Sequence, residues 1–323
     1  MKSVLVMGGS YFIGKSLVNT LLENDYDVTV LNRGSRKFND LRVKELISDR
    51  NDASRMKDVL ENKVFDFVVD VSGLKKSQVE ILCDSLDMSK LKKFIFLSSS
   101  AVYDIDNLKT PYLETDSLAE NSVWTFYGKN KIESEEYLSN RLNQYSVDFI
   151  ALRPPYVYGE ENYAQRESFI FEHIENNKPI ILPNKGESRL QFIYRKDLAL
   201  TIEALLRQET EKNMIFNVGN SSSMSFRQWI GFCEKIVGKA ATLVEFDYVA
   251  NNRKDREFFP FFDYDNILNS DEIKKYYDSE TDFLTGLNNA YKWYCDNKET
   301  IKFKEVVTKN EIEILSSVEL IPR

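Results

Sequence analysis

Short apolar runs alternate with stretches of helical periodicity through the first half of the chain. After the apolar run 4–7 the sequence breaks at Gly8-Gly9-Ser10, and apolar residues then recur at the spacing of one helix face. This alternation continues to residue 152. It predicts strands at 4–7, 27–31, 45–47, 65–71, 94–97 and 147–152, and helices from 13 onward, at 53–62, 77–86 and 127–145. Strands separated by helices of this length predict a doubly wound, parallel α/β sheet.

The second half of the chain is less regular. It predicts strands at 190–194 and 214–218, the latter returning to the sheet, and helices at 167–176, 197–208 and 226–237. We therefore expect a sheet domain from residues 1–152 and 191–218. Residues 153–190 and 219–323 are expected to form a smaller lobe from discontinuous segments. For residues 301–323, which are charged and partly apolar, no element is predicted.

The turn between the first strand and the first helix has the composition of a pyrophosphate site. Its residues Gly8, Gly9, Ser10, Tyr11, Phe12, Ile13 and Gly14 would bring backbone N–H groups and a helix N-terminus to an anion. Tyr11 stands where a glycine is usual, so a generic turn without a nucleotide is the alternative. The second strand ends at Asn32-Arg33-Gly34, where such a unit would meet the adenosine ribose.

Composition narrows the class of function. The chain of 323 residues carries 43 Lys and Arg against 51 Asp and Glu, and this net charge of −8 opposes nucleic-acid binding. No window approaches the ~20 apolar residues of a membrane span, and no targeting segment is visible. Cys83, Cys233 and Cys295 are scattered, which favours a cytoplasmic protein without a metal site. Cys83 is expected in the core, and the only histidine, His173, on the surface.

The chemistry is expected from Ser99, Tyr127 and Lys131. Tyr127 and Lys131 are four residues apart near a helix start, so they share one face. A nearby ammonium stabilises a phenolate and brings the tyrosine pKa, ordinarily about 10, closer to neutrality. Ser99 follows the fifth strand, where its hydroxyl can hydrogen-bond a substrate oxygen. Together these residues indicate general acid–base chemistry on a substrate hydroxyl.

On these residues the sequence resembles the extended short-chain dehydrogenase/reductase family, the nucleotide-sugar epimerases and dehydratases. The resemblance covers residues 3 to about 298 and is nearest to the branch that includes chloroplast stem-loop-binding proteins. It rests on GGSYFIG (8–14), FIFLSSSAVY (94–103), YGKNK (127–131), LRPPYVYG (152–159), QFIYRKDLA (191–199) and FNVG (216–219), together with the Asn32-Arg33-Gly34 turn. It implies a Rossmann-type NAD(P)-binding sheet with a substrate-binding lobe.

The resemblance also implies roles for individual residues. Ser99, Tyr127 and Lys131 would form the catalytic set, and Lys131 would also hold the nicotinamide ribose. Asp49 and Arg50 would lie near the adenine. The arginine that usually holds the substrate phosphate aligns with Leu190, beside Arg189, whereas a second phosphate arginine matches Arg253. The family also implies pairing of chains through the long helices, and hence a homodimer.

Three functions stay open at this stage. The first is an epimerase of a nucleotide sugar, most simply a 4-epimerase. A dehydratase is disfavoured because Ser100-Ala101 replaces the usual Asp-Glu. The second is a net reductase of a non-sugar carbonyl, and the third is a nucleic-acid-binding or regulatory protein that retains the fold. Because Arg33 stands where NAD-preferring members carry an acid, NADP is favoured over NAD as the cofactor.

Overall fold

The computed structural model describes residues 1–38 and 40–318, which divide into two units. The first unit comprises 1–157, 195–221 and 268–280, and the second comprises 158–194, 222–267 and 281 onward. Residues 268–280, assigned above to the smaller lobe, lie in the first unit, and the whole of the predicted strand 190–194 lies in the second.

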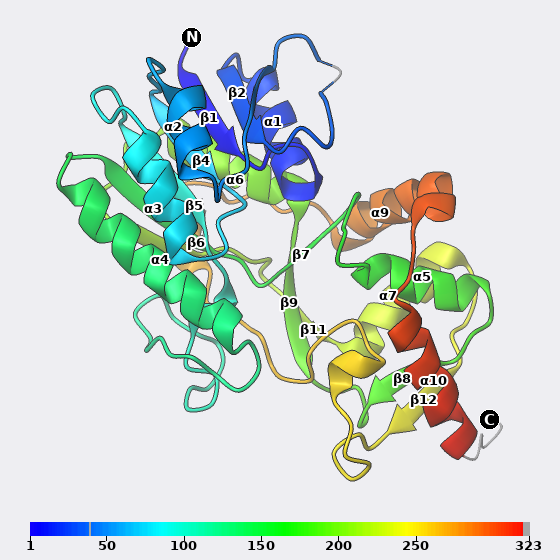
Figure 1. The fold of residues 1–323 in the computed structure, drawn as a ribbon. Helices are drawn as coiled ribbons and strands as arrows, with labels where there is room; N and C mark the ends of the chain where they lie inside the picture. The colour runs from blue at the N-terminus through cyan, green and yellow to red at the C-terminus, as the bar shows by residue number, and fades with distance from the viewer. Residues whose placement is uncertain (39, 319–323) are drawn as a thin grey trace. The chain divides into compact units, whose positions relative to one another are not determined.

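In the described residues of the first unit, seven parallel strands form the sheet (Figure 1). Their order is β10-β6-β5-β4-β1-β2-β3, so the strand order reverses between β1 and β4. A sheet of this kind binds its ligand at the carboxyl ends of the strands beside that reversal. The strands are β1 Ser3–Met7, β2 Asp27–Asn32, β3 Lys44–Ile47, β4 Phe67–Asp70, β5 Lys93–Leu97, β6 Asp148–Arg153 and β10 Met214–Asn217.

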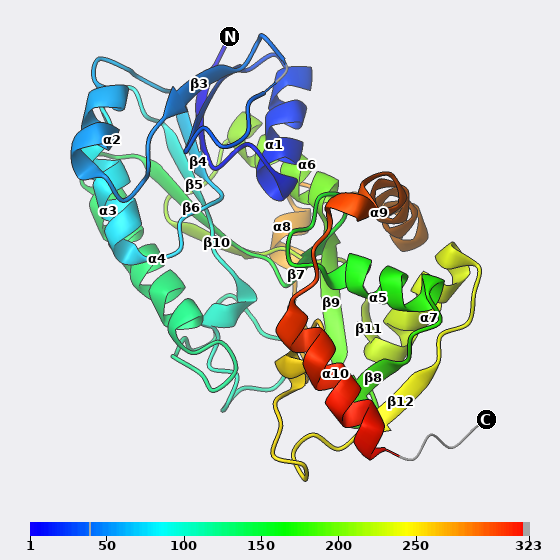
Figure 2. The ribbon, with the colours of Figure 1, turned by 45° about the vertical axis from the view of Figure 1, so that its right-hand side comes forward.

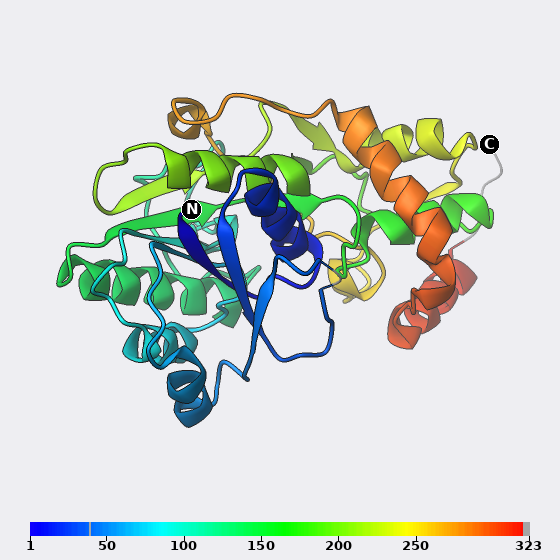
Figure 3. The same ribbon diagram turned by 90° about the horizontal axis from the view of Figure 1, so that it is seen from above.

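Helices cover both faces of this sheet. On one face α2 (Ala53–Leu60), α3 (Lys76–Ser85) and α4 (Phe126–Asn143) lie side by side (Figure 2). On the other, α1 (Phe12–Glu23) packs along α6 (Arg195–Arg207) (Figure 3). The buried positions of α2, α3 and α4 meet alternate residues of β4, β5 and β6, as a sheet covered by amphipathic helices requires. Short pieces complete the unit: the 3₁₀ turn η1 Ser100–Val102 and the helix α8 Asp271–Lys274.

Up to residue 318, the second unit is built from short strands and four longer helices. β8 (Ile180–Pro183) pairs in parallel with β12 (Leu243–Phe246), and β9 (Arg189–Tyr194) pairs antiparallel with β11 (Ser223–Ser225). A capping box of Ser225 and Gln228 begins the second of the helices. The helices are α5 Arg166–Glu175, α7 Phe226–Val237, α9 Phe283–Asn297 and α10 Glu305–Ser317; β7 Tyr156–Tyr158 crosses the sequence boundary between the units, and η2 Asp255–Glu257 and η3 Lys298–Thr300 are 3₁₀ turns.

The sheet and its alternation with helices confirm the predicted α/β class, and Cys83 lies in the core as expected. The surface placement of His173 is wrong, because its ring is buried between α5 and α10. α10 is an element that the pattern does not predict, and residues 319–323 of that terminal stretch lie outside the described residues. Within 1–38 and 40–318, no helix is long and apolar enough to span a bilayer.

Candidate active site

Glycines at positions 8 and 14 let the chain close tightly in the turn after β1. Gly8 has φ +85°, a conformation that other residues rarely adopt. A Cβ on Gly14 would lie 2.2 Å from the Gly8 carbonyl oxygen, and a Cβ on Gly8 would lie 2.5 Å from Ser72 Cβ. The turns after β1 and β4 therefore touch at the strand reversal. The first turn of α1 carries no acidic residue, so its N-terminus can accept an anion. This cradle fits a dinucleotide.

Tyr11, the departure from the family turn, is contacted by the loop after β2. The guanidinium carbon of Arg36 lies 3.9 Å from the centroid of the Tyr11 ring, the geometry of a cation–π stack. The next residue, Phe12, has φ 45°, which is uncommon for a non-glycine residue. The bulky Tyr11 is thus compatible with the turn, and it holds a cation beside it.

Asn32 at the end of β2 presents a donor. Its Oδ1 accepts a hydrogen bond of 2.6 Å from the backbone N–H of Gly34. A backbone N–H can only donate, so this contact fixes which end of the amide is oxygen. The Nδ2 is buried and has no hydrogen-bond partner within residues 1–38 and 40–318. The group offered to a ligand here is consequently an N–H donor, next to Arg33.

Asp49 and Arg50 follow β3 but have different surroundings. Asp49 is exposed, and hydrogen bonds from the backbone and side chain of Asn51 hold its pKa below the usual range. Arg50 instead forms a bidentate pair with the buried Asp70 (3.0 and 2.6 Å) and donates to Ser72 Oγ at 2.6 Å. Their proximity to an adenine stays a prediction.

Lys131 is buried inside the first unit near the ends of β4 and β5. Its Nζ donates to the carbonyl oxygens of Gly73 and Leu97, each at 2.6 Å. Burial lowers the pKa of Lys131 to about 8, with Asp70 opposing and Arg50 adding to that effect. Its Nζ lies 6.0 Å from the centroid of the Tyr127 ring, and Tyr127 itself is half-buried. An ammonium this close favours the phenolate form of a tyrosine.

Ser99 and Tyr127 belong to two segments that touch. A Cβ on Gly128 would lie only 2.3 Å from the carbonyl oxygen of Ala101, so the first turn of α4 sits directly on η1. Buried Asn121 ties the same segments, because its Nδ2 donates to the carbonyls of Ala101 (2.9 Å) and Tyr103 (3.0 Å). Ser99 Oγ accepts from the Ala101 N–H at 3.2 Å, so its own O–H proton can be donated to a ligand.

A buried ion pair supports the serine loop, residues 98–100. Arg153 pairs with Glu135 at 2.6 Å, and the same carboxylate accepts a hydrogen bond from Ser98. Arg153 also donates to the hydroxyl of Tyr103 at 3.2 Å. The backbone N–H groups of Ser98 and Ser100 donate to the carbonyl oxygens of Leu152 and Pro154, so the segments that follow β5 and β6 lie side by side. Breaking one partner of such a pair would leave a buried charge.

The two predicted substrate arginines lie in the second unit and are already paired. Arg189 donates to the carbonyl of Ser223 at 2.6 Å and to its Oγ at 3.2 Å. Arg253 forms ion pairs with Glu313 of α10 (2.7 Å) and Glu257 (3.5 Å). Whether they bind a substrate phosphate stays a prediction.

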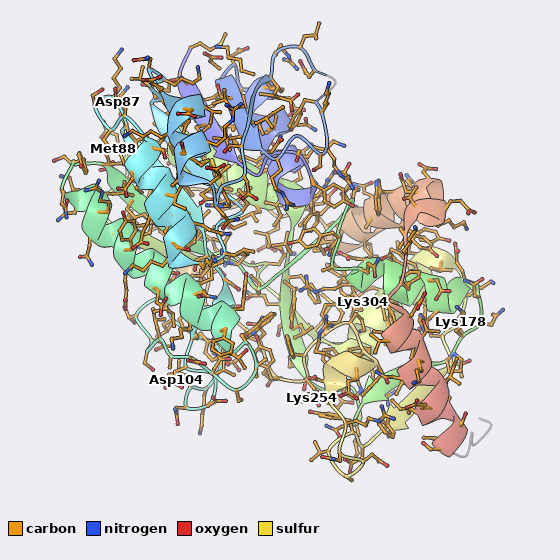
Figure 4. All side chains as sticks on the ribbon, viewed as in Figure 1. Asp87, Met88, Asp104, Lys178, Lys254 and Lys304 are labelled. Atoms are coloured by element: carbon orange, nitrogen blue, oxygen red, sulfur yellow. The ribbon has the colours of Figure 1, made fainter. Side chains whose placement is uncertain are left out.

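A cavity of about 510 Å³ lies in the second unit, and neither the predicted catalytic residues nor the predicted cofactor residues line it. Its lining comes from α5, the segment 256–260 and α10, and includes Lys178 and Lys304, which Figure 4 labels. His173 and Glu311 meet in its wall, with Nε2 and Oε1 2.8 Å apart. No group of three or more metal-ligating side chains occurs in the described parts of the chain.

Reading the sequence missed Asp70, Asn121 and Glu135, which hold Lys131 and the serine loop. A signal existed for Asp70, a carboxylate inside an otherwise apolar strand, because a buried charge needs a partner. Asn121 and Glu135 carried no such signal, because an asparagine in a loop and a glutamate in a helix are ordinary surface residues.

Similarity to known proteins agrees with this geometry. Residues 4–219 match the model of the NAD dependent epimerase/dehydratase family. Chloroplast stem-loop binding protein of 41 kDa b from Arabidopsis thaliana is 29% identical over 311 residues, covering 90% of this chain and 78% of that protein. A putative UDP-glucose 4-epimerase from Methanocaldococcus jannaschii is 27% identical, covering 92% and 100%.

A solved structure shares the fold. The UDP-glucose 4-epimerase of Thermotoga maritima with UDP-glucose superposes with a TM-score of 0.77 at 19% identity, covering 92% of this chain and 99% of that one.

The glycine cradle and the sheet define a nicotinamide-dinucleotide enzyme of the extended short-chain dehydrogenase/reductase type. The chain belongs to the NAD dependent epimerase/dehydratase family.

Proposed function

We propose that this protein interconverts nucleotide sugars by reversible hydride transfer, most simply as a sugar 4-epimerase that uses Tyr127, Lys131 and Ser99. The observation that carries the proposal is the contact between the first turn of α4 and the serine loop. That contact, at Gly128 and Ala101, brings the segments of Tyr127 and Ser99 together beside the buried Lys131. A binding protein that only retained the fold would not need this set.

The chain's own groups handle the proton. The bound nicotinamide supplies hydride acceptance and return. Tyr127, as phenolate, removes the proton from the sugar hydroxyl while Ser99 donates a hydrogen bond to the same oxygen. Lys131 stabilises the phenolate through its charge and can donate to the cofactor ribose. In an epimerase the keto sugar rotates within the site before the proton returns from Tyr127. The same residue therefore serves first as base and then as acid.

For the cofactor we propose NADP(H) in preference to NAD(H), at a site formed by residues 8–14, Asn32 and Arg33, with Asp49 and Arg50 toward the adenine. A ribose diol is best read by a carboxylate that accepts its hydrogen bonds, whereas a 2′-phosphate only accepts. The N–H donor of Asn32 and the stacked Arg36 support the phosphate. Calorimetry with NADPH and NADH tests this preference, and equal affinities would contradict it.

For the substrate we propose that Arg253 and Arg189 grip a diphosphate. UDP should then raise the melting temperature by binding the folded state, and the double substitution to alanine should abolish the rise. Arg253 has to exchange Glu313 for the ligand, so Glu313→Ala should increase the UDP-induced shift. The matched control is Arg227→Ala, another partly exposed, ion-paired arginine of this unit.

The second candidate function is a net reductase of a non-sugar carbonyl compound. Leu190 at the family's phosphate position and the ion pairs of Arg253 favour it. If UDP, GDP, CDP and dTDP all leave the melting temperature unchanged at millimolar concentration, the reductase replaces the epimerase. Nucleic-acid binding is the third candidate, suggested by the name of the Arabidopsis relative and opposed by the net charge of −8.

The deciding experiment identifies the nucleotide released when the purified protein is denatured. A retained, oxidised cofactor supports an epimerase, which regenerates its cofactor in every turnover. Conversion of UDP-sugars is then followed directly. We also expect a cytoplasmic homodimer, which sedimentation and cell fractionation would test.

A further inference from the structure

Asp70, at the carboxyl end of β4, shapes the turn that holds Lys131. Its carboxylate is fully buried, and Oδ1 accepts hydrogen bonds from the backbone N–H groups of Ser72 (3.0 Å) and Gly73 (2.9 Å). These bonds bend the chain directly after the strand, as short acidic side chains do in turns. The Gly73 carbonyl is one of the two acceptors of Lys131 Nζ.

The position of the ammonium is strongly determined by this turn. An ammonium has three N–H donors, and two of them are directed to the carbonyls of Gly73 and Leu97. Once two donors are fixed, the direction of the third follows from tetrahedral geometry. A displacement of the Gly73 carbonyl would therefore redirect the third N–H of Lys131, the one proposed to reach the cofactor ribose.

Gly73 leaves no room for an alternative arrangement. A Cβ at this residue would lie 2.7 Å from Asp70 Oδ2 and 2.8 Å from the Phe96 ring. Arg50 closes the other side, pairing with both oxygens of Asp70. One buried carboxylate thus lies next to the guanidinium of Arg50 and near the ammonium of Lys131.

We propose that Asp70 is a positioning residue, which fixes Lys131 through the Gly73 turn and, together with Arg50, sets the electrostatic environment of its ammonium. This assignment rests on the proposed function only for its consequence in turnover. The geometry holds for the chain without substrate.

The charges around Lys131 give the proposal a distinctive signature. The groups that face it are Asp70 after β4, Arg50 after β3, and Glu135 and Tyr127 on its own helix. Burial lowers the pKa of Lys131 to about 8; Asp70 and Glu135 raise it, and Arg50 lowers it. Removing Asp70 and removing Arg50 should therefore move the titration of Lys131 in opposite directions. If Asp70 only supported the turn, the two substitutions would not shift the pKa of Lys131 in opposite directions.

The test follows the Lys131 side-chain resonance in protein labelled with carbon-13 lysine, assigned by its loss in Lys131→Met. Asp70→Asn keeps an oxygen for the turn and removes the charge, so the titration midpoint of Lys131 should fall by on the order of one pH unit. Arg50→Met should raise it by a similar amount. Asp66→Asn, which breaks the exposed pair with Lys92 at the other end of β4, should leave it unchanged.

The same variants are then titrated with NADPH between pH 6 and 10. Asp70→Asn should weaken binding and move its alkaline decline to lower pH. Midpoints that stay fixed, or that move together in both variants, overturn the assignment. If Asp70→Asn does not fold, the rise in Arg50→Met decides alone. If the unmodified protein binds neither NADPH nor NADH, the proposed function fails, while the resonance midpoints still decide the role of Asp70.

Discussion

The guanidinium of Arg36 stacks on the ring of Tyr11, 3.9 Å from its centroid. Tyr11 stands where a glycine is usual in the turn after β1, and Arg36 lies in the loop that follows β2. The two departures from the expected nucleotide site therefore meet: the ring that replaces the glycine holds a cation of the loop after β2, whose first residues, 33–36, carry no acid.

Removing either cation after β2 should narrow the preference for NADPH. We expect Arg33→Ala and Arg36→Ala each to lower NADPH affinity by about ten-fold, the value of one hydrogen bond to a charged group, and to leave NADH affinity unchanged. Arg42→Ala is the control, because Arg42 is exposed and paired with Asp40 in the same loop region. Calorimetry measures both ligands. Parallel losses for NADPH and NADH would mean that the arginines serve the turn and not a 2′-phosphate.

The pattern of the sequence predicted the sheet well because burial on both faces makes each parallel strand a continuous apolar run. β1, β4 and β5 are of this kind. It did not predict α10, whose 13 residues mix apolar and charged side chains. It also failed for His173, because a polar ring in a helix is buried only when another element supplies a partner, here Glu311.

The candidate site divides in the same way. Tyr127 and Lys131 are four residues apart on one helix, and Ser99 lies just after a predicted strand, so local patterns could identify them. The glycine turn is also visible in the sequence. Asp70, Asn121 and Glu135 act through contacts with segments far along the chain, such as Asn121 with Ala101. Periodicity carries no information about such contacts, so only the fold could reveal them.

The anchoring of α10 should depend on Glu311. Glu311→Ala removes the partner of the buried His173 Nε2, and we expect a loss of about 1–3 kcal/mol in stability. Glu313→Ala, which breaks an exposed ion pair on the same helix, should cost less than about 1 kcal/mol. Chemical denaturation measures both, and limited proteolysis should show earlier cleavage at 305–317 in Glu311→Ala alone. Equal effects would argue against the histidine contact as the anchor.

Burying the Lys131 ammonium should make stability depend on alkaline pH. Because burial lowers its folded pKa to about 8 from 10.5, the unfolded chain binds more protons between these values. The charge therefore costs stability below pH 8, and this cost fades as the pH rises toward 10.5. Relative to Lys131→Met, the unmodified protein should gain stability over that range, by on the order of 3 kcal/mol in full. Urea unfolding of both proteins at pH 7.5 and 10 tests this prediction. The contributions of other titrating groups largely cancel when the two proteins are compared. A constant difference would mean that Lys131 titrates normally.

Gly128→Ala should damage activity more than stability. Its Cβ would lie 2.3 Å from the Ala101 carbonyl and would push the start of α4 away from the serine loop. We expect overpacking to cost about 1–3 kcal/mol, and the displacement of Tyr127 from Ser99 to cost roughly 10²-fold in turnover. Gly231→Ala is the matched control: this glycine is also helical, and its nearest atom would be 3.9 Å away. It should be neutral or slightly stabilising.

Tyr127→Phe should separate the enzyme from a binding protein. The change removes one oxygen, so the fold and cofactor affinity should persist. The proton of the sugar hydroxyl then has no acceptor, because Lys131 is committed to two carbonyls and the Ser99 proton is too tightly held. Loss of general acid–base help costs about 10²–10⁴ in rate, and we expect a decrease in that range. Ser99→Ala should cost less, and Lys131→Met should weaken both turnover and cofactor binding. Tyr145→Phe, just beyond the end of α4, is the control. Conversion of UDP-sugars and oxidation of NADPH by carbonyl compounds are the two assays. An activity that survives Tyr127→Phe intact would exclude this tyrosine as the acid–base residue.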